Sequence, residues 1–268
     1  MPPALRLFSL ILLLLAACAP SPAPAGTSEL VVFAAASLNE PFTRMAQDYE
    51  ASHSGLSVSL NFAGSNQLAQ QIIQGAPADV FASANPQQAE LLVQAGLAQA
   101  GDLQVFSHNR LVVVYPASNP AHLGSLQDLA SPGLRLILAD PQVPVGAYAR
   151  QFLLQASQDP AFEPGFADRV SLNVVSYEAN VKAVVNKVVL GEADAGIVYT
   201  SDVTSENRTS LGQLEIPEHL NVLASYLVLP LAEAGSRSEA QGFIAFVLSP
   251  DGQTLLAEAG FSPLSGAP

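Results

Sequence analysis

The sequence predicts an α/β protein with mostly parallel sheets flanked by helices. From Glu29 onward, short β-branched runs alternate with amphipathic helical stretches, an order typical of parallel strands joined by crossover helices. Serine, proline and glycine stand where several of these helices are expected to begin and end. The chain has 268 residues, of which 49% are hydrophobic, so either one large domain or two modest ones could form a sizeable core.

The first half of the pattern follows a regular βαβαβα order. Leu30–Phe33 is an apolar run of strand length, and the next apolar positions, Leu38, Phe42, Met45 and Tyr49, share one helical face. The first six elements, strand and helix in turn, are expected at residues 30–33, 38–49, 56–62, 65–74, 78–82 and 86–95.

The alternation continues toward the C-terminus. Strands are expected near residues 111–115, 134–139, 172–175, 195–199 and 226–229, and helices near residues 146–156, 181–190, 239–248 and 252–258. This many units fits either one wide sheet or two lobes. The polar, extended stretches at 106–111 and 220–227 favour two lobes joined by a pair of crossovers.

The N-terminal segment has the features of an export signal. Arg6 is followed by an apolar run, Leu10–Leu15, that is too short to span a bilayer stably. The stretch Leu15-Ala16-Ala17-Cys18 resembles the lipobox of bacterial lipoproteins, in which the cysteine carries the lipid; an ordinary cleavable signal is the alternative. We expect a signal peptide at residues 1–17 and a Pro-, Ala- and Ser-rich tether at residues 18–28. The protein would then lie in the periplasm or on the outer face of the cytoplasmic membrane.

The chain is strongly acidic. Its formal net charge is −13, and loss of residues 1–17 would make it −14, because Arg6 is the one charged side chain in that segment. Nucleic-acid binding, which needs a basic surface, is therefore not expected. An anionic ligand would have to be held by local dipoles and hydrogen bonds, since the overall field opposes its approach.

The sequence lacks the common catalytic motifs. It contains no HExxH, GxSxG, SxxK, P-loop or GxGxxG pattern, and its histidines are isolated from one another. Four aspartates are expected near strand ends: Asp79, Asp140, Asp194 and Asp202. At such positions, capping or solvated acids are commoner than catalytic carboxylate pairs. We therefore expect a binding protein without a cofactor, and not an enzyme.

Candidate ligand contacts fall at the junctions between strands and helices, where helix N-termini present free N–H groups. Ser37 and Ser65 each follow small residues at the start of a helix. Val145 and Val181 open later helices and can offer a backbone N–H, and Tyr199 ends a buried strand with a hydroxyl. Taken singly, each is also an ordinary helix cap, helix start or packing residue.

Six short segments of the chain, taken together, form a pattern that is specific enough to indicate a protein family. They are Phe33-Ala34-Ala35-Ala36-Ser37-Leu38, Gly64-Ser65 before Leu68, Gly75-Ala76-Pro77-Ala78-Asp79-Val80-Phe81, Val143-Pro144-Val145-Gly146 before Tyr148-Ala149, Asn180-Val181, and Gly196-Ile197-Val198-Tyr199 before Ser201-Asp202. In order and spacing they resemble the periplasmic molybdate-binding protein family, over about residues 29–261.

This resemblance implies a two-lobed periplasmic-binding-protein-like fold of type II, with crossover hinge strands between the lobes. The lobes would close on molybdate or tungstate and deliver it to the membrane permease of an ABC importer. We expect lobe 1 at residues 29–108 with 228–268, and lobe 2 at residues 109–227. We also expect the protein to be a monomer.

Matched position by position, the resemblance implies a cage of five residues that donate hydrogen bonds to the oxyanion. Ser37 and Ser65 would each give a hydroxyl and a backbone N–H from lobe 1. Val145 and Val181 would give backbone N–H groups from lobe 2, and Tyr199 its hydroxyl. No direct metal ligand is implied, because every contact goes to an oxygen of the anion.

The donor set bears on the choice of anion. Molybdate, tungstate and sulfate are fully deprotonated dianions near neutral pH and need only donors, whereas phosphate carries a proton that needs an acceptor. Two departures from the family leave selectivity open: Val145 stands where alanine is frequent, and Asn66 replaces another small hydroxyl residue. Sulfate is therefore the main alternative ligand.

Overall fold

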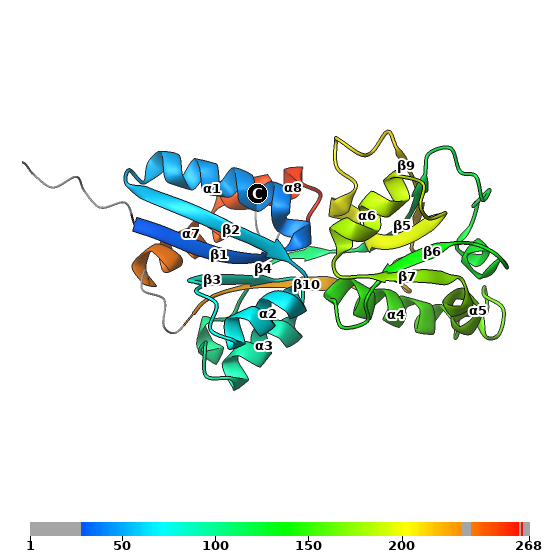
Figure 1. Ribbon diagram of the computed structural model, residues 1–268, viewed down its shortest axis with the longest axis horizontal. Coiled ribbons are helices and arrows are strands. Elements are labelled where there is room, and N and C mark those ends of the chain that lie inside the picture. Colours follow the sequence, from blue (N-terminus) through cyan, green and yellow to red (C-terminus); the bar gives the residue numbers. More distant parts are fainter. Residues whose placement is uncertain (1–27, 232–236, 263, 265–268) are drawn as a thin grey trace, which may run out of the picture.

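A computed structural model describes residues 28–231, 237–262 and 264. The chain forms two lobes, each a five-stranded sheet with helices on both faces (Figure 1). The expected signal peptide at residues 1–17, Cys18 and the tether up to residue 27 lie outside the described residues, and Ser28 already belongs to a strand. No helix in the described ranges combines the length and the apolar character needed to cross a membrane.

The first sheet has the strand order β2-β1-β3-β10-β4. β1 pairs in parallel with β2 and with β3, whereas β10 runs antiparallel to both β3 and β4. The strands are β1 (Ser28–Ala35), β2 (Leu56–Ala63), β3 (Val80–Ser83), β4 (Gln104–Asn109) and β10 (Ala224–Pro230). Strand β3 is buried along its whole length, as expected of a strand covered on both faces.

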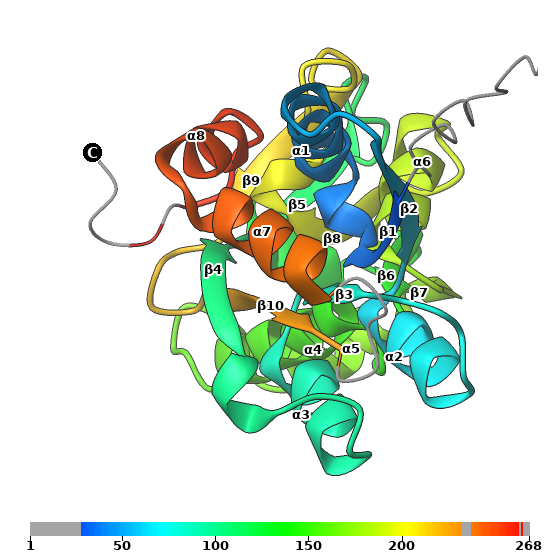
Figure 2. The same cartoon turned by 90° about the vertical axis from the view of Figure 1, so that its left-hand side faces the viewer.

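Helices cover both faces of the first sheet (Figure 2). One face carries α1 (Asn39–Ser52), α7 (Arg237–Leu248) and α8 (Pro250–Glu258), so the C-terminal helices return to the first lobe. The other face carries α2 (Ser65–Ile73) and α3 (Pro86–Gln94). Each face therefore has its own apolar core.

The second sheet repeats this plan with the order β7-β6-β8-β5-β9. β6 pairs in parallel with β7 and β8, and β5 runs antiparallel to β8 and β9. The strands are β5 (Leu111–Pro116), β6 (Leu136–Ala139), β7 (Val174–Glu178), β8 (Ala195–Tyr199) and β9 (Leu211–Glu215). The predicted two-lobed α/β fold is confirmed, although each sheet is mixed because one strand, β10 or β5, runs against the others.

Three helices flank the second sheet. They are α4 (Pro144–Ala156), α5 (Phe166–Leu172) and α6 (Val181–Val189). Helix α6 covers one face, and α4 with α5 covers the other (Figure 1). Because β6 and β7 are parallel, their carboxyl ends and the N-termini of α4 and α6 lie at the same edge of the sheet, which faces the first lobe.

The chain passes between the sheets twice. Strand β4 ends at Asn109 and β5 begins at Leu111, so the first passage occupies a single residue. The return lies between β9 and β10, and Ala224 of β10 already pairs with Asn109. The boundaries expected at 108/109 and 227/228 thus fall inside β4 and β10, because ladder pairing extends the first sheet to those points.

One local expectation is wrong. The strand expected at residues 172–175 begins at Val174 instead, because Phe166–Leu172 forms helix α5. Asn173 fixes the turn between the two elements: its buried side-chain amide donates to the carbonyls of Leu129 and Ser131, at 2.8 Å in each case.

Candidate functional site

A small cavity lies where the two lobes face each other. Its walls come from three junctions of the first lobe and three of the second, and the lining residues are Ala35, Ala36, Ser37, Ala63, Gly64, Ser65, Ala84, Val143, Pro144, Val145, Asn180, Val181 and Tyr199. The cavity is only about 10 Å³. A space of that size holds about one water molecule, so it excludes a sugar or a peptide.

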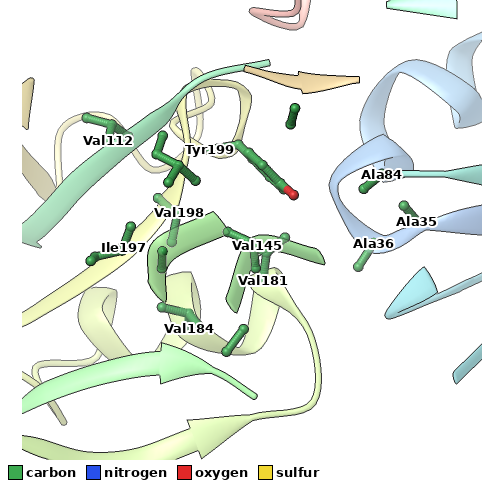
Figure 3. Packing of buried hydrophobic residues seen from close by; sticks show 14 of the residues in the cluster. Ala35, Ala36, Ala84, Val112, Val145, Val181, Val184, Ile197, Val198 and Tyr199 are labelled. Carbon is green, nitrogen blue, oxygen red and sulfur yellow. The ribbon is translucent and has the colours of Figure 1, made fainter. Parts of the chain in front are cut away.

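The structure brings all five sequence-predicted contact residues to this cavity. Ser37 and Ser65 line it from the first lobe, and Val145, Val181 and Tyr199 line it from the second. Figure 3 shows Val145, Val181 and the Tyr199 ring opposite the small side chains of the first lobe, with the Tyr199 hydroxyl pointing toward them. We call these five residues the donor cage.

The first lobe supplies two buried serines. Ser37 lies in the 3₁₀ turn Ala36–Leu38 that follows β1, and its Oγ is 2.8 Å from the Tyr226 hydroxyl. Ser65 is the first residue of α2, and its Oγ accepts a hydrogen bond of 3.1 Å from the backbone N–H of Ala84. A hydroxyl oxygen that accepts from the backbone keeps its own hydrogen for another partner, so Ser65 is set up to donate into the cavity.

The second lobe supplies main-chain donors at two helix N-termini. Val145 is the second residue of α4 and Val181 the first of α6, and N–H groups at these positions have no partner within the helix. The Asn180 side chain caps α6 by accepting from the N–H of Ala183, which leaves the N–H of Val181 free of the cap. The positive ends of both helix dipoles therefore point at the cavity.

Tyr199 ends β8 with a hydroxyl that has no hydrogen-bond partner among the described residues, although its side chain is 1% exposed. A buried polar group without a partner costs free energy, so such groups are rare outside functional sites. Burial raises the pKa of Tyr199 well above its usual value, and the neighbouring Tyr226, Tyr148 and Asp202 add to that rise. The hydroxyl therefore keeps its proton and can donate a hydrogen bond to a ligand.

A buried carboxylate lies directly behind Tyr199. Asp202 is fully buried, and its Oδ2 accepts the backbone N–H of Tyr199 at 3.0 Å. Burial raises the pKa of Asp202, and Lys182, whose Nζ is 3.3 Å from Oδ1, opposes that rise. Asp202 is thus a cap with a cationic partner, which limits its repulsion of an anion in the cage.

Glycines allow the parts of the site to approach one another. A Cβ at Gly64 would lie 2.7 Å from the carbonyl oxygen of Ala179, which belongs to the opposite lobe. A Cβ at Gly146 would lie 2.2 Å from the carbonyl oxygen of Asp140. Gly64 therefore permits contact between the lobes, and Gly146 lets α4 start close to the end of β6.

A wider groove of about 710 Å³ lies beside the cage and is lined mainly by asparagine and glutamine side chains of α2 and α3. Several of these amides, such as Gln67, Gln70 and Gln87, are exposed, so water competes for their hydrogen bonds. The enclosed donor cage is the better anion site. Within the described residues, no cluster of three His, Cys, Asp or Glu side chains could hold a metal ion.

Sequence reasoning did not identify three groups near the cage: Tyr226 behind Ser37, Lys182 beside Asp202, and Asn109 at the end of β4. Each of the three lies near the cage because of a contact with a residue distant in the sequence. No local motif marks them.

The fold is that of a two-lobed solute-binding protein, with a cavity between the lobes that is lined by hydrogen-bond donors. The chain belongs to the family of bacterial extracellular solute-binding proteins, whose family model matches residues 30–262. It is 38% identical over 247 residues to the molybdate-binding protein ModA of Mycobacterium tuberculosis (strain H37Rv), covering 91% of this chain and 89% of that protein.

Solved structures share the fold. The substrate-binding domain of a putative molybdenum ABC transporter from Clostridium difficile superposes with a TM-score of 0.66 at 28% identity, over 89% of this chain and 100% of that one. The periplasmic molybdate-binding protein of Azotobacter vinelandii superposes with a TM-score of 0.76 at 21% identity, over 88% of this chain and 100% of that one. At 21% identity, the match to the Azotobacter protein supports the fold alone.

Proposed function

We propose that this chain captures molybdate, and also tungstate, outside the cytoplasm and delivers it to the membrane permease of an ABC importer. The observation that carries the proposal is the Tyr199 hydroxyl, buried and unpartnered among the described residues, at the wall of a cavity lined by further donors. The mycobacterial relative named for molybdate supports the choice of anion. The clostridial structure named for a molybdenum ABC transporter supports the importer as partner.

Neutral donors are sufficient to hold a dianion here. A hydrogen bond to a charged group contributes about 1.5 to 3 kcal/mol. The cage offers seven such donors, since each serine gives a hydroxyl and a backbone N–H, and together they contribute about 10 to 20 kcal/mol. That total can supply the roughly 8 kcal/mol of micromolar affinity together with part of the cost of association. The acidic surface of the chain does not prevent this, because it is screened by salt whereas the donors act at contact distance.

Binding and lobe closure form one equilibrium in this proposal. The serines belong to the first lobe and Val145, Val181 and Tyr199 to the second, so only a closed arrangement lets one ion contact all five. The anion then stabilises closure by its contacts with both lobes.

Gly64→Ala tests this coupling. The new Cβ would meet the carbonyl oxygen of Ala179 at 2.7 Å across the lobes and Asn66 Oδ1 at 2.8 Å within the first lobe. The Asn66 side chain can turn away, whereas the backbone carbonyl of Ala179 can retreat only if the lobes separate, so the substitution opposes closure. A strain of about 1 to 3 kcal/mol in the closed form alone lowers the affinity for molybdate by about five- to a hundred-fold. Gly101→Ala is the matched control, since a Cβ there meets nothing within 4 Å. Equal calorimetric affinities for the two variants would argue against the coupling.

The ligand is tested by titration calorimetry of anion-free protein with molybdate, tungstate, sulfate and hydrogen phosphate. We expect submicromolar binding of molybdate and tungstate, weaker binding of the smaller sulfate, and no comparable binding of hydrogen phosphate, whose proton finds no acceptor in the cage. A preference for sulfate over molybdate would contradict the proposed ligand.

The location of the protein is proposed from the N-terminal segment, with the lipid carried by Cys18. In bacteria that express the full chain, Cys18→Ala is expected to abolish a lipid-dependent mass increase and to remove the protein from the membrane fraction, because the acyl chains supply the anchor. Recovery of wild type and variant in the same soluble fraction would show that the segment is an ordinary signal.

A further inference from the structure

Tyr226 lies directly behind the donor cage and does not line the cavity. It is on β10, it is fully buried, and its hydroxyl is 2.8 Å from Ser37 Oγ. Its ring is held by edge-to-face contacts with Phe106, Tyr199 and Phe261. The hydroxyl is therefore fixed in place, and what it does for Ser37 depends on which of the two groups donates.

A second buried polar residue near the cage is Asn109, at the end of β4. Asn109 Oδ1 accepts the backbone N–H of Arg110 at 2.9 Å and the hydroxyl of Thr200 at 2.9 Å. Because a backbone N–H can only donate, this contact fixes which end of the amide is oxygen. The Nδ2 end must then donate, and it does so to Ser201 Oγ at 2.7 Å.

Burial raises the pKa of Tyr226 well above its usual value, so the phenol keeps its hydrogen. For Ser37 to give its own hydrogen to an anion in the cage, as the proposed function requires, its Oγ must accept from another donor. The phenol has one hydrogen of its own, and Ser37 Oγ is the acceptor at hydrogen-bond distance.

We propose that Tyr226 is a positioning residue that donates to Ser37 Oγ and so leaves the Ser37 hydrogen for the bound oxyanion, in a donor relay from Tyr226 through Ser37 to the anion. The relay matches the arrangement at Ser65, whose Oγ accepts from the N–H of Ala84. Donors aligned in a chain polarise one another, so each strengthens the next.

The relay also connects the cage to the strands at which the chain crosses between lobes. Asn109 ends β4, Tyr226 lies on β10, and these two strands are paired. Asn109 further binds Thr200 and Ser201, the residues that follow Tyr199. The Asn109 amide thus holds the turn next to the tyrosine donor of the second lobe, and its strand pairs with the strand that carries Tyr226.

The relay rests on the proposed function, and Tyr226→Phe tests it because this change removes the hydroxyl and keeps the ring. We expect molybdate affinity to fall by about three- to ten-fold, the loss of one neutral hydrogen bond. Tyr49→Phe is the control: Tyr49 is a buried tyrosine of the same lobe, and it lies outside the cavity lining. This control should bind as wild type does.

A double-mutant cycle separates a relay from a structural role. In a Ser37→Ala background, Tyr226→Phe should change affinity by less than about 1.5-fold, because its route to the anion is gone. In a Ser65→Ala background it should keep its full effect, since Tyr226 acts through Ser37 alone. Equal effects of Tyr226→Phe in both backgrounds would overturn the relay. Failure of the wild type to bind molybdate would instead overturn the proposed function, so the two failures are distinguishable.

Discussion

Replacing Tyr199 by phenylalanine is expected to weaken molybdate binding by about ten-fold or more. Tyr199 is 1% exposed and lines the cavity, and its hydroxyl points toward the first lobe, so it would donate one hydrogen bond to a charged oxygen. The loss of about 1.5 to 3 kcal/mol corresponds to roughly ten- to a hundred-fold in affinity. Isothermal titration calorimetry measures this directly, and an unchanged affinity would remove Tyr199 from the site.

The same substitution should not destabilise the ligand-free protein. The Tyr199 hydroxyl has no hydrogen-bond partner among the described residues, so its removal relieves a buried unpaired group at no cost in hydrogen bonds. We expect an equal or higher melting temperature without ligand, together with a smaller rise on addition of molybdate. A lower melting temperature in the free protein would indicate instead that Tyr199 is a packing residue.

Val181→Pro is the second substitution with a large expected effect. Proline is tolerated at the first position of a helix because the N–H there has no partner within the helix. Asn180 before it is extended, with φ −162° and ψ 169°, and that conformation is compatible with a following proline. The fold should therefore persist while one main-chain donor is lost, and affinity should fall by about ten-fold or more.

Val181→Ala is the matched control for this prediction. It removes part of a buried side chain and keeps the N–H, so it should lower the melting temperature modestly and leave molybdate affinity nearly unchanged. If the alanine variant loses as much affinity as the proline variant, the contribution of Val181 comes from its side chain. That result would contradict a main-chain donor at the start of α6.

Much of the fold can be predicted from local sequence patterns. The apolar face of Phe42, Met45 and Tyr49 marks α1, and the Ser65 start marks α2, because a helical face and a helix start each depend on neighbouring residues. Strand direction is different, since it depends on where the chain returns. Nothing local in Ala224–Pro230 shows that β10 enters between β3 and β4 against their direction.

Two short elements, strand β9 and helix α5, were the hardest to predict. Strand β9 has the sequence Leu-Gly-Gln-Leu-Glu, with no β-branched residue, and it forms by pairing with β5 at the sheet edge. Helix α5 is only seven residues long and depends on packing, including the contact between Phe162 and Phe166. Both elements owe their structure to partners and not to propensity.

The candidate site, too, could be predicted from the sequence only in part. Its five residues lie at strand-to-helix junctions that the sequence reveals, so their meeting at one cavity could be predicted. The groups behind them could not: Ser37 and Tyr226 are 189 positions apart, and Asn109 and Ser201 are 92 apart. The first contact exists only once β10 has returned to the first sheet, and the second only once the two lobes are joined.

An acidic protein can hold a dianion in this way because the site works at contact range. The helix N-termini of α4 and α6, the two serines and Tyr199 concentrate donor groups from buried residues around one cavity. In such a site each hydrogen bond is stronger than in water. Lys182 pairs with the one buried carboxylate next to Tyr199, so that carboxylate does not face the anion unpaired.

The most direct test of the account is a crystal structure of the molybdate complex in which the anomalous signal of molybdenum fixes the position of the metal. The account predicts one molybdenum between Ser37 and Tyr199, with its oxygens within hydrogen-bond distance of both serines, the N–H groups of Val145 and Val181, and the Tyr199 hydroxyl. Molybdenum bound elsewhere, or in this cavity without contact to the Tyr199 hydroxyl, would contradict it.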